Sequence, residues 1–170
     1  AFVIPDFFFY TIAAGALGVA FMPVLADKIA QGNKQAVRDI TNSLLNVVSI
    51  AMLLVAVVIF VLAKPLMQAL APNLPPEHLQ QAITIMQLIS LNPLFFAVGG
   101  IVTALQQTYG RFFFYATSSL FYNAAIILSI YLFKDNLGII GLGVGALIGG
   151  ILQLLISMMG LVGLGYGYRP

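Results

Sequence analysis

The sequence contains no cysteine and only one histidine, His78, among its 170 residues. Without cysteine the chain cannot form disulfides, bind a metal through thiolates or use a thiol nucleophile. A single histidine leaves almost nothing from which to build a histidine metal site or a Ser-His-Asp triad. We therefore expect a protein that is not an enzyme and that binds neither a metal ion nor another cofactor.

Charge is also scarce. Charged residues make up 7% of the chain and hydrophobic residues 61%, whereas soluble domains carry about 25% charged residues. Soluble classes are therefore excluded, and an integral membrane protein is predicted. The net charge of +2 arises from seven basic and five acidic residues. Because the basic residues are scattered, they form no patch for nucleic acid, and we expect no nucleic-acid partner.

The positions of the twelve charges divide the chain into spans. Uncharged stretches cover 7–26, 40–63, 79–110, 112–133 and 136–168. Each has enough residues for a helix to cross the roughly 30 Å hydrocarbon core of a bilayer. Continuous apolar runs without alternation disfavour a β-barrel. The sequence therefore predicts an all-α bundle of five transmembrane helices, over about 1–29, 35–70, 77–108, 111–133 and 138–164.

Short loops make consecutive helices antiparallel and allow the orientation to be predicted. Two basic residues, Lys64 and Lys134, lie on one side, and five lie on the other: Lys28, Lys34, Arg38, Arg111 and Arg169. The richer side is expected to be cytoplasmic, with the C-terminus on it. The chain opens without Met and without the features of a signal peptide, so we expect it to be an internal piece of a longer protein.

Small and polar residues inside the spans give the candidate functional positions. Gly141, Gly145 and Gly149 are spaced by four and continue into Gln153 and Ser157, a pattern that predicts close helix packing. The polar residues of the spans, Gln153 and Ser157 included, have two explanations, interhelical hydrogen bonding or a place on a water-filled transport route. The candidates for a cavity or substrate-facing role are Asp6, Tyr10, Asn46 and Asn123.

Several segments together resemble one known family. Ile4-Pro5-Asp6, Ala14-Gly15-Ala16 and Ala20-Phe21-Met22-Pro23-Val24-Leu25-Ala26 are similar to the LPN, EGA and AFVPVLAE elements of the MurJ/MviN lipid II flippases. The later segments agree in order and spacing, and they are Gln31-Gly32-Asn33, Ala63-Lys64-Pro65, Leu70-Ala71-Pro72, Arg111-Phe112, Asn123, 138–142, 149–154 and 165–170. This family lies within the multidrug/oligosaccharidyl-lipid/polysaccharide exporter superfamily.

The resemblance implies both an architecture and a departure from it. The chain would be family helices two to six, a partial N-terminal lobe over 1–170 of a transporter with two six-helix lobes around a cationic cavity. Where the family carries paired arginines and a glutamate, this chain has Phe9, Tyr10 and Ala14. The anion-binding residues of the family therefore do not carry over. Either the missing first helix and second lobe supply the charge, or the substrate differs.

The resemblance implies a lipid-linked peptidoglycan precursor flippase of the bacterial cytoplasmic membrane, working by alternating access. Its partners would be the lipid II-like precursor, membrane lipids and the remaining helices of the same transporter. Two alternatives stay open from the residues alone. One is a polysaccharide-lipid or multidrug exporter of the same superfamily, and the other is a non-transporting membrane scaffold that binds partners through its small-residue faces.

Overall fold

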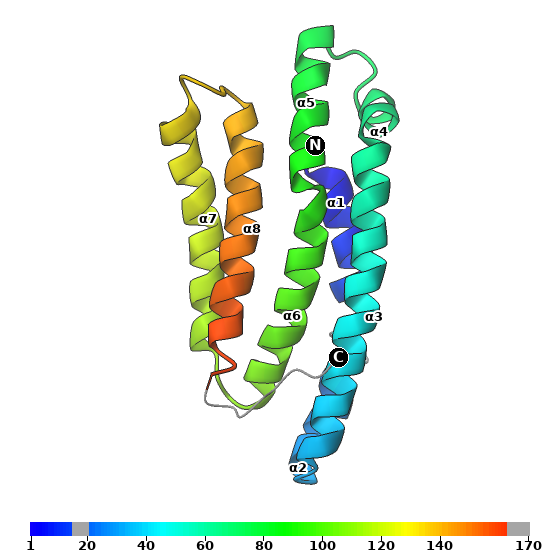
Figure 1. Cartoon of the computed structure of the whole chain (residues 1–170), viewed down its shortest axis with the longest axis vertical. Helices are drawn as coiled ribbons and strands as arrows, with labels where there is room; N and C mark the ends of the chain where they lie inside the picture. Colours follow the sequence, from blue (N-terminus) through cyan, green and yellow to red (C-terminus); the bar gives the residue numbers. More distant parts are fainter. Residues whose placement is uncertain (15–20, 163–170) are drawn as a thin grey trace.

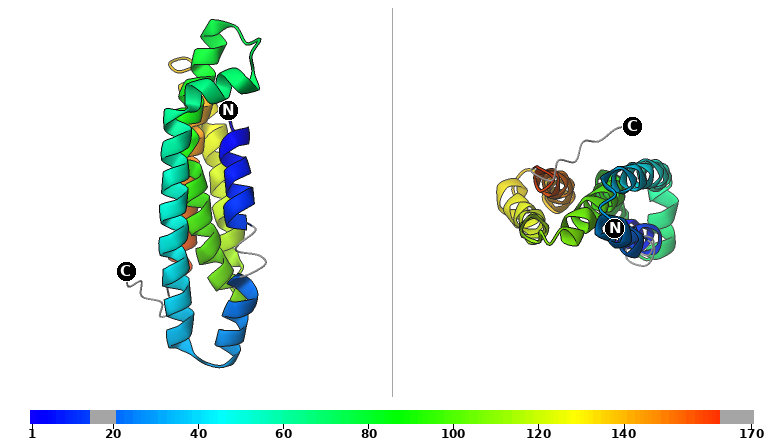
Figure 2. Two further views of the ribbon diagram at one scale, coloured as in Figure 1. Left: turned by 90° about the vertical axis from the view of Figure 1, so that its right-hand side faces the viewer. Right: turned by 90° about the horizontal axis from the view of Figure 1, so that it is seen from below.

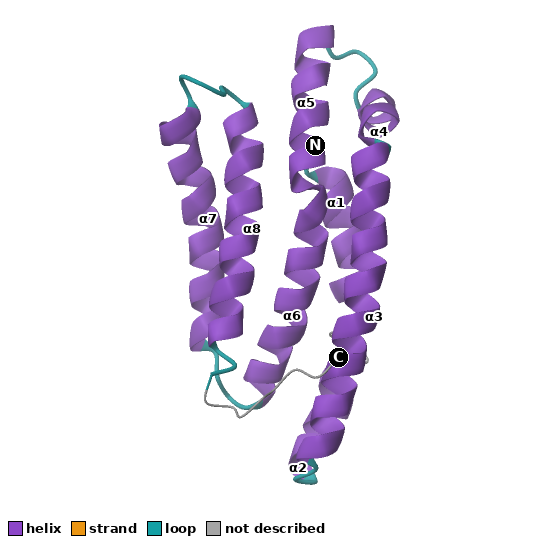
Figure 3. Cartoon of the chain, viewed as in Figure 1, coloured by secondary structure: helices purple, strands orange, loops and turns teal. Residues whose placement is uncertain are grey.

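The computed structural model describes residues 1–14 and 21–162, which form helices joined by turns and contain no strand in these ranges (Figure 3). The long helices run alternately up and down the molecule (Figure 1). They are α3 (Lys34–Val61), the stretch from α5 (Pro76–Leu88) to α6 (Asn92–Thr108), α7 (Phe113–Phe133) and α8 (Ile140–Met159). The short loops explain why neighbours in sequence are antiparallel neighbours in space.

Four helical stretches in the described ranges are long and apolar enough to cross a membrane: Lys34–Val61, Pro76–Thr108, Phe113–Phe133 and Ile140–Met159. The predicted all-α membrane class is thereby confirmed. The described part of the first predicted span, 1–29, is not α-helical throughout. It comprises α1 (Val3–Phe8), a π-helical segment η1 (Phe9–Ala14) and α2 (Met22–Ala30). Residues 15–20, with Gly15 and Ala16, and residues 163–170, with Arg169 and the segment 165–170, lie outside the description.

The loops gather at the two ends of the bundle (Figure 1). The α2–α3 and α6–α7 turns lie at one end of the bundle, and Lys28, Lys34 and Arg111 lie in or beside them. The connection from α4 (Ala63–Leu70) to α5 and the α7–α8 turn lie at the other end, with Lys64 and Lys134. This is the division that the loop order predicts. The side that faces the cytoplasm stays a prediction from the excess of basic residues.

Two prolines explain where the predicted long helices break. Pro65 has no N–H to donate to the carbonyl of Val61, and the helix predicted over 35–70 is broken at Leu62, between α3 and α4. Pro93 similarly cannot donate to Ile89, and the 3-10 turn η3 (Ile89–Leu91) replaces that bond with one from the Asn92 N–H. Such local adjustment satisfies the freed carbonyl within a membrane helix.

The distribution of polarity is that of a protein in lipid. Large apolar side chains on the outer faces of α3 and α7 are exposed, among them Leu54, Val61, Leu120 and Leu132. Polar side chains lie inside instead, including Thr41, Asn42, Ser90, Asn92, Thr103, Gln106, Ser118, Ser129 and Ser157. Hydrocarbon accepts the apolar exterior, whereas the polar groups must find partners within the bundle.

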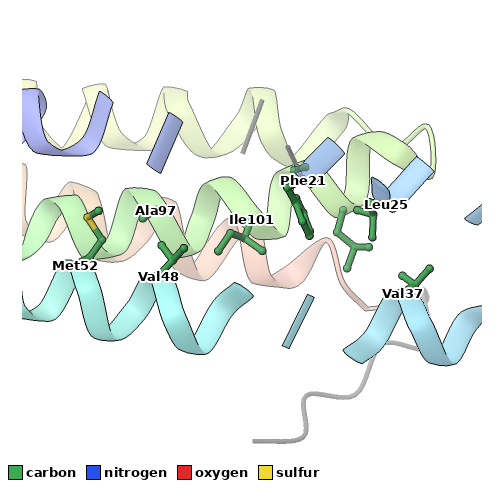
Figure 4. Close-up of a cluster of buried hydrophobic side chains, with 9 residues drawn as sticks. Phe21, Leu25, Val37, Val48, Met52, Ala97 and Ile101 are labelled. Atoms are coloured by element: carbon green, nitrogen blue, oxygen red, sulfur yellow. The ribbon is translucent and has the colours of Figure 1, made fainter. Parts of the chain in front are cut away.

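The largest apolar core joins α2, α3 and α6 (Figure 4). Leu25 of α2, Met52 of α3 and Ile101 of α6 are completely buried in it. On the other side of α6 lies the α7–α8 hairpin, as the view along the bundle shows (Figure 2). The α5–α6 stretch therefore stands in the middle and supports two groups of helices.

Glycines allow α8 to approach α7 closely. A Cβ added at Gly141 would lie 3.0 Å from the Cβ of Phe133, and one at Gly149 would lie 2.9 Å from the carbonyl oxygen of Tyr122. A Cβ at Gly145 would collide with the Ser129 side chain. The three glycines predicted to pack thus all lie at the α7–α8 contact, with backbone approach that a larger residue would prevent.

A second set of glycines faces the opposite way, toward α5 and α6. A Cβ at Gly143 would lie 3.3 Å from the Ile85 Cα, and one at Gly150 would lie 3.0 Å from the Asn92 Oδ1. A Cβ at Gly160 would collide with the Gln106 amide. Helix α8 is therefore held from two sides, with small residues on both.

Side-chain amides of α6 bind the backbone of α8 at two levels. Asn92 donates its Nδ2–H to the carbonyl of Ala146 at 3.2 Å, and Gln106 donates its Nε2–H to the carbonyl of Ser157 at 2.6 Å. Nearby, Arg111 donates to the carbonyl of Val162 at 3.2 Å. We call the Asn92 and Gln106 bonds the amide anchors. They fix the height of α8 along α6 as well as its distance.

We expect Gly145→Leu in the full-length protein to lower stability by about 1–3 kcal/mol, the usual cost of overpacking. The added side chain has no space against Ser129. The measurement is the midpoint of thermal unfolding of the detergent-solubilised protein. Gly99→Ala is the matched control, because a Cβ there meets its nearest neighbour, the Ser157 Oγ, at 3.9 Å. An equal loss in both variants would contradict the close packing of α8 on α7.

We expect Gln106→Met to lower stability by about 0.6–1.7 kcal/mol, the range measured for interhelical hydrogen bonds in membranes. The loss is moderated because the Gln106 Oε1 is buried without a partner in the described part of the chain, and methionine removes this atom too. Gln80→Met, at an exposed position of α5, is the control. If the unfolding midpoint of Gln106→Met is as high as that of this control, the hydrogen bond from Gln106 to the Ser157 carbonyl does not stabilise the protein.

Candidate functional site

A cleft of about 270 Å³ lies between η1, α6, α7 and α8. Each long helix contributes residues that are three to four apart and so share one face. The contributions are Phe96, Gly99, Gly100 and Thr103 from α6, Tyr115, Ser118 and Tyr122 from α7, and Gln153 and Ser157 from α8. Phe9 and Tyr10 of η1 complete the lining. We refer to this site below as the cleft.

One wall of the cleft is a connected row of aromatic rings. Tyr10 and Phe9 have ring centroids 5.3 Å apart, Phe9 and Phe96 5.8 Å, and Phe96 and Tyr122 5.2 Å. All three pairs meet edge to face, the arrangement favoured by the ring quadrupoles. The row joins η1, α6 and α7, so the aromatic wall is built by three segments that are distant in the sequence.

The remaining lining is polar but uncharged. Thr103 donates its hydroxyl to the Gly100 carbonyl at 3.0 Å, and Ser118 donates to the Tyr115 carbonyl at 2.9 Å. The Ser157 hydroxyl is 1% exposed and has no hydrogen-bond partner among the described residues. A buried polar atom without a partner is costly. It marks a place where a polar group of a ligand or a water molecule is needed.

None of the described residues that line the cleft carries a charge. Within 1–14 and 21–162, no three His, Cys, Asp or Glu side chains gather where they could hold a metal ion. The cleft therefore combines flat aromatic surface with hydroxyls, an amide and two glycines. Such a lining can bind a neutral ligand by stacking and hydrogen bonding, and it offers no chemistry for holding an anion by charge.

The structure brings one of the four predicted site residues to the cleft, namely Tyr10. Asp6 is half-buried on α1, four residues earlier, and does not line it. Asn46 is half-buried on α3, where it has an interaction within the protein. Asn123 is exposed on α7 and donates its amide to the Ser119 carbonyl of the same helix at 2.9 Å.

Several lining residues were not among the predicted candidates. Phe96, Tyr115 and Tyr122 were not selected, and for Gln153 and Ser157 helix packing and a place on a transport route both stayed open. The available signal was spacing, since the aromatic and polar residues of α6 and α7 recur at i, i+3 and i+7. Phe9 and Tyr10, the positions where the family resemblance implies arginines, both line the cleft.

A second and larger hollow, of about 550 Å³, lies between α2 and α3. Its lining is apolar except for Asp39 and Ser43, and the other residues are Phe21, Val24, Ile40, Leu44 and Val47. It lacks the converging polar groups that orient a ligand in a binding site. The cleft is therefore the better candidate, although it is smaller.

Comparison with known proteins agrees with the family resemblance of the sequence. A family model described as lipid II flippase MurJ matches residues 1–170. A probable lipid II flippase MurJ of Borreliella burgdorferi is 28% identical over 170 residues, which cover 99% of this chain and 33% of that protein. Its counterpart in Buchnera aphidicola is 24% identical over 162 residues, covering 93% and 32% respectively. No solved structure matches the chain.

The chain thus spans about a third of the length of these relatives. The family match does not favour the two alternatives drawn from the sequence, a non-transporting membrane scaffold and a polysaccharide-lipid or multidrug exporter. It agrees with the sequence resemblance, with the membrane-length helices and with a lining that is polar inside an apolar exterior. The family model covers the whole chain, and the chain therefore belongs to the MurJ family of lipid II flippases.

Proposed function

We propose that this chain is part of a transporter that moves lipid II, a lipid-linked peptidoglycan precursor, across the bacterial cytoplasmic membrane. The observation that carries the proposal is the match to the lipid II flippase family over all 170 residues. The two relatives, both named as probable lipid II flippases, support it. The partners would be the precursor, the surrounding lipids and the helices that complete the transporter.

The arrangement of polarity suits this activity. A flippase has to carry a polar headgroup through hydrocarbon, where an unpaired polar group costs several kcal/mol. This bundle faces lipid with apolar residues and keeps hydroxyl and amide groups inside. The cleft places some of these groups on a surface where a headgroup can replace lost water contacts.

Alternating access requires bundles that move as units. The α7–α8 hairpin and the α5–α6 stretch are joined by the amide anchors and by glycines on both sides of α8. These contacts would let the helices of this chain rock together against the remainder of the transporter. With about a third of the relatives' length, the chain would form most of one such bundle.

A pyrophosphate needs fixed positive charge when it leaves water. The described residues of the cleft supply none, because all of them are uncharged. We infer that arginines or lysines from parts of the transporter beyond these 170 residues hold the pyrophosphate. The chain's own share of substrate binding would then be the neutral portion of the headgroup.

The test is a rescue experiment with the full-length gene in bacteria depleted of their own lipid II flippase. We expect restored growth, together with precursor that becomes accessible to a cleaving enzyme added outside the cells. The matched control is the protein with Gly145→Leu, which we expect to rescue less because α8 no longer packs on α7. Normal amounts of wild-type protein in the membrane without rescue would contradict the proposed function.

A further inference from the structure

The cleft has a lining of unusual chemistry for a transporter of an anionic lipid. Five aromatic rings, those of Phe9, Tyr10, Phe96, Tyr115 and Tyr122, lie beside the amide of Gln153 and the hydroxyls of three further residues. Tyr10 and Tyr115 expose 67% and 50% of their surface. Phe96 and Tyr122 are half-buried and meet each other edge to face, and Phe9 joins Phe96 to Tyr10.

We propose that the cleft binds an uncharged sugar ring of the lipid-linked substrate; the proposal rests on the function above and names the part of the substrate held here. Sugar C–H groups carry slight positive charge and pack on the negative faces of aromatic rings. Sugar hydroxyl and acetamido groups both donate and accept hydrogen bonds. The Gln153 amide and the Ser157 hydroxyl can likewise both donate and accept hydrogen bonds.

The size of the cleft agrees with a single ring. Sites for drug-sized ligands have volumes of about 300–1,000 Å³, and the cleft has about 270 Å³. One hexose ring with a small substituent is thus a suitable occupant, whereas a whole headgroup is too large. The glycines Gly99 and Gly100 line the cleft without side chains and leave room for the ring.

Charge argues against the other parts of the substrate. None of the described lining residues is cationic. They therefore offer a pyrophosphate no positive charge to compensate for its loss of water. A hydrocarbon tail would offer no hydrogen bond to the Ser157 hydroxyl, which is buried and without a partner in the described ranges. Apolar atoms against it would leave its desolvation uncompensated.

The Ser157 hydroxyl is the second observation that points to a ligand. Its carbonyl is bound by the Gln106 amide, which holds this turn of α8 against α6. Ser157 is one of the residues that line the cleft, it is 1% exposed, and its hydroxyl is buried. A hydroxyl or acetamido group of a sugar at this point would supply the hydrogen bond that the protein does not provide.

The experiment measures binding to the purified full-length protein in nanodiscs with two probes. One is lipid II, and the other is undecaprenyl pyrophosphate, which has the pyrophosphate and a polyprenyl tail but no sugar. We expect Tyr115→Ala and Gln153→Ala each to weaken lipid II binding about fivefold, the effect of losing one aromatic or hydrogen-bonding contact. Binding of undecaprenyl pyrophosphate should stay unchanged.

Two controls separate binding from structure. Tyr131→Ala removes a tyrosine of α7 that is 71% exposed and does not line the cleft, and it should bind both lipids as the wild type does. Tyr115→Phe keeps the ring and should retain most of the affinity for lipid II. This conservative variant keeps the test valid if a truncated variant proves unstable.

Each remaining outcome decides against the proposal. Unchanged lipid II binding in Tyr115→Ala and Gln153→Ala would overturn it, and so would equal weakening toward both lipids. In those cases the proposed function stands, provided that the wild type binds lipid II. A wild-type protein that binds neither lipid would contradict the proposed function together with the sugar site.

Discussion

The structure depends on one constraint, namely that polar groups inside a membrane must find partners within the protein. Helix α8 shows how this constraint is met. Asn92 and Gln106 extend from α6 and bind its backbone carbonyls, while glycines on two sides permit the approach of α6 and α7. In lipid, where apolar contact alone gives little drive to associate, close packing and such hydrogen bonds hold helices together.

The same contacts determine the cleft. Ser157 lies at one anchor through its carbonyl and is one of the residues that line the cleft, so the position of α8 on α6 sets the position of the polar lining. The aromatic row then connects this region to η1 through Phe96. The packing of α8 and the shape of the cleft are therefore linked, and a change in the height of α8 would alter both.

The sequence was sufficient for the membrane class and for the family. Charges end the helices and prolines break them, and both signals are local. It was not sufficient for the cleft, because a helix in lipid is apolar on its outer face too, and the usual contrast between buried and exposed sides is weak. Asn123 illustrates this, since it is polar but faces outward on α7. The second glycine face of α8 was missed because Gly143, Gly150 and Gly160 follow no single period.

If a lipid-linked sugar enters the cleft during transport, the precursor must pass beside Tyr115. This can be tested by placing a photoreactive phenylalanine analogue at position 115 or 131 of the full-length protein in living cells. We expect irradiation to link the precursor to position 115, in the cleft, and not to position 131, which is 71% exposed on the same helix and does not line the cleft. Equal labelling at both positions, or labelling at 131 alone, would contradict the proposed sugar site.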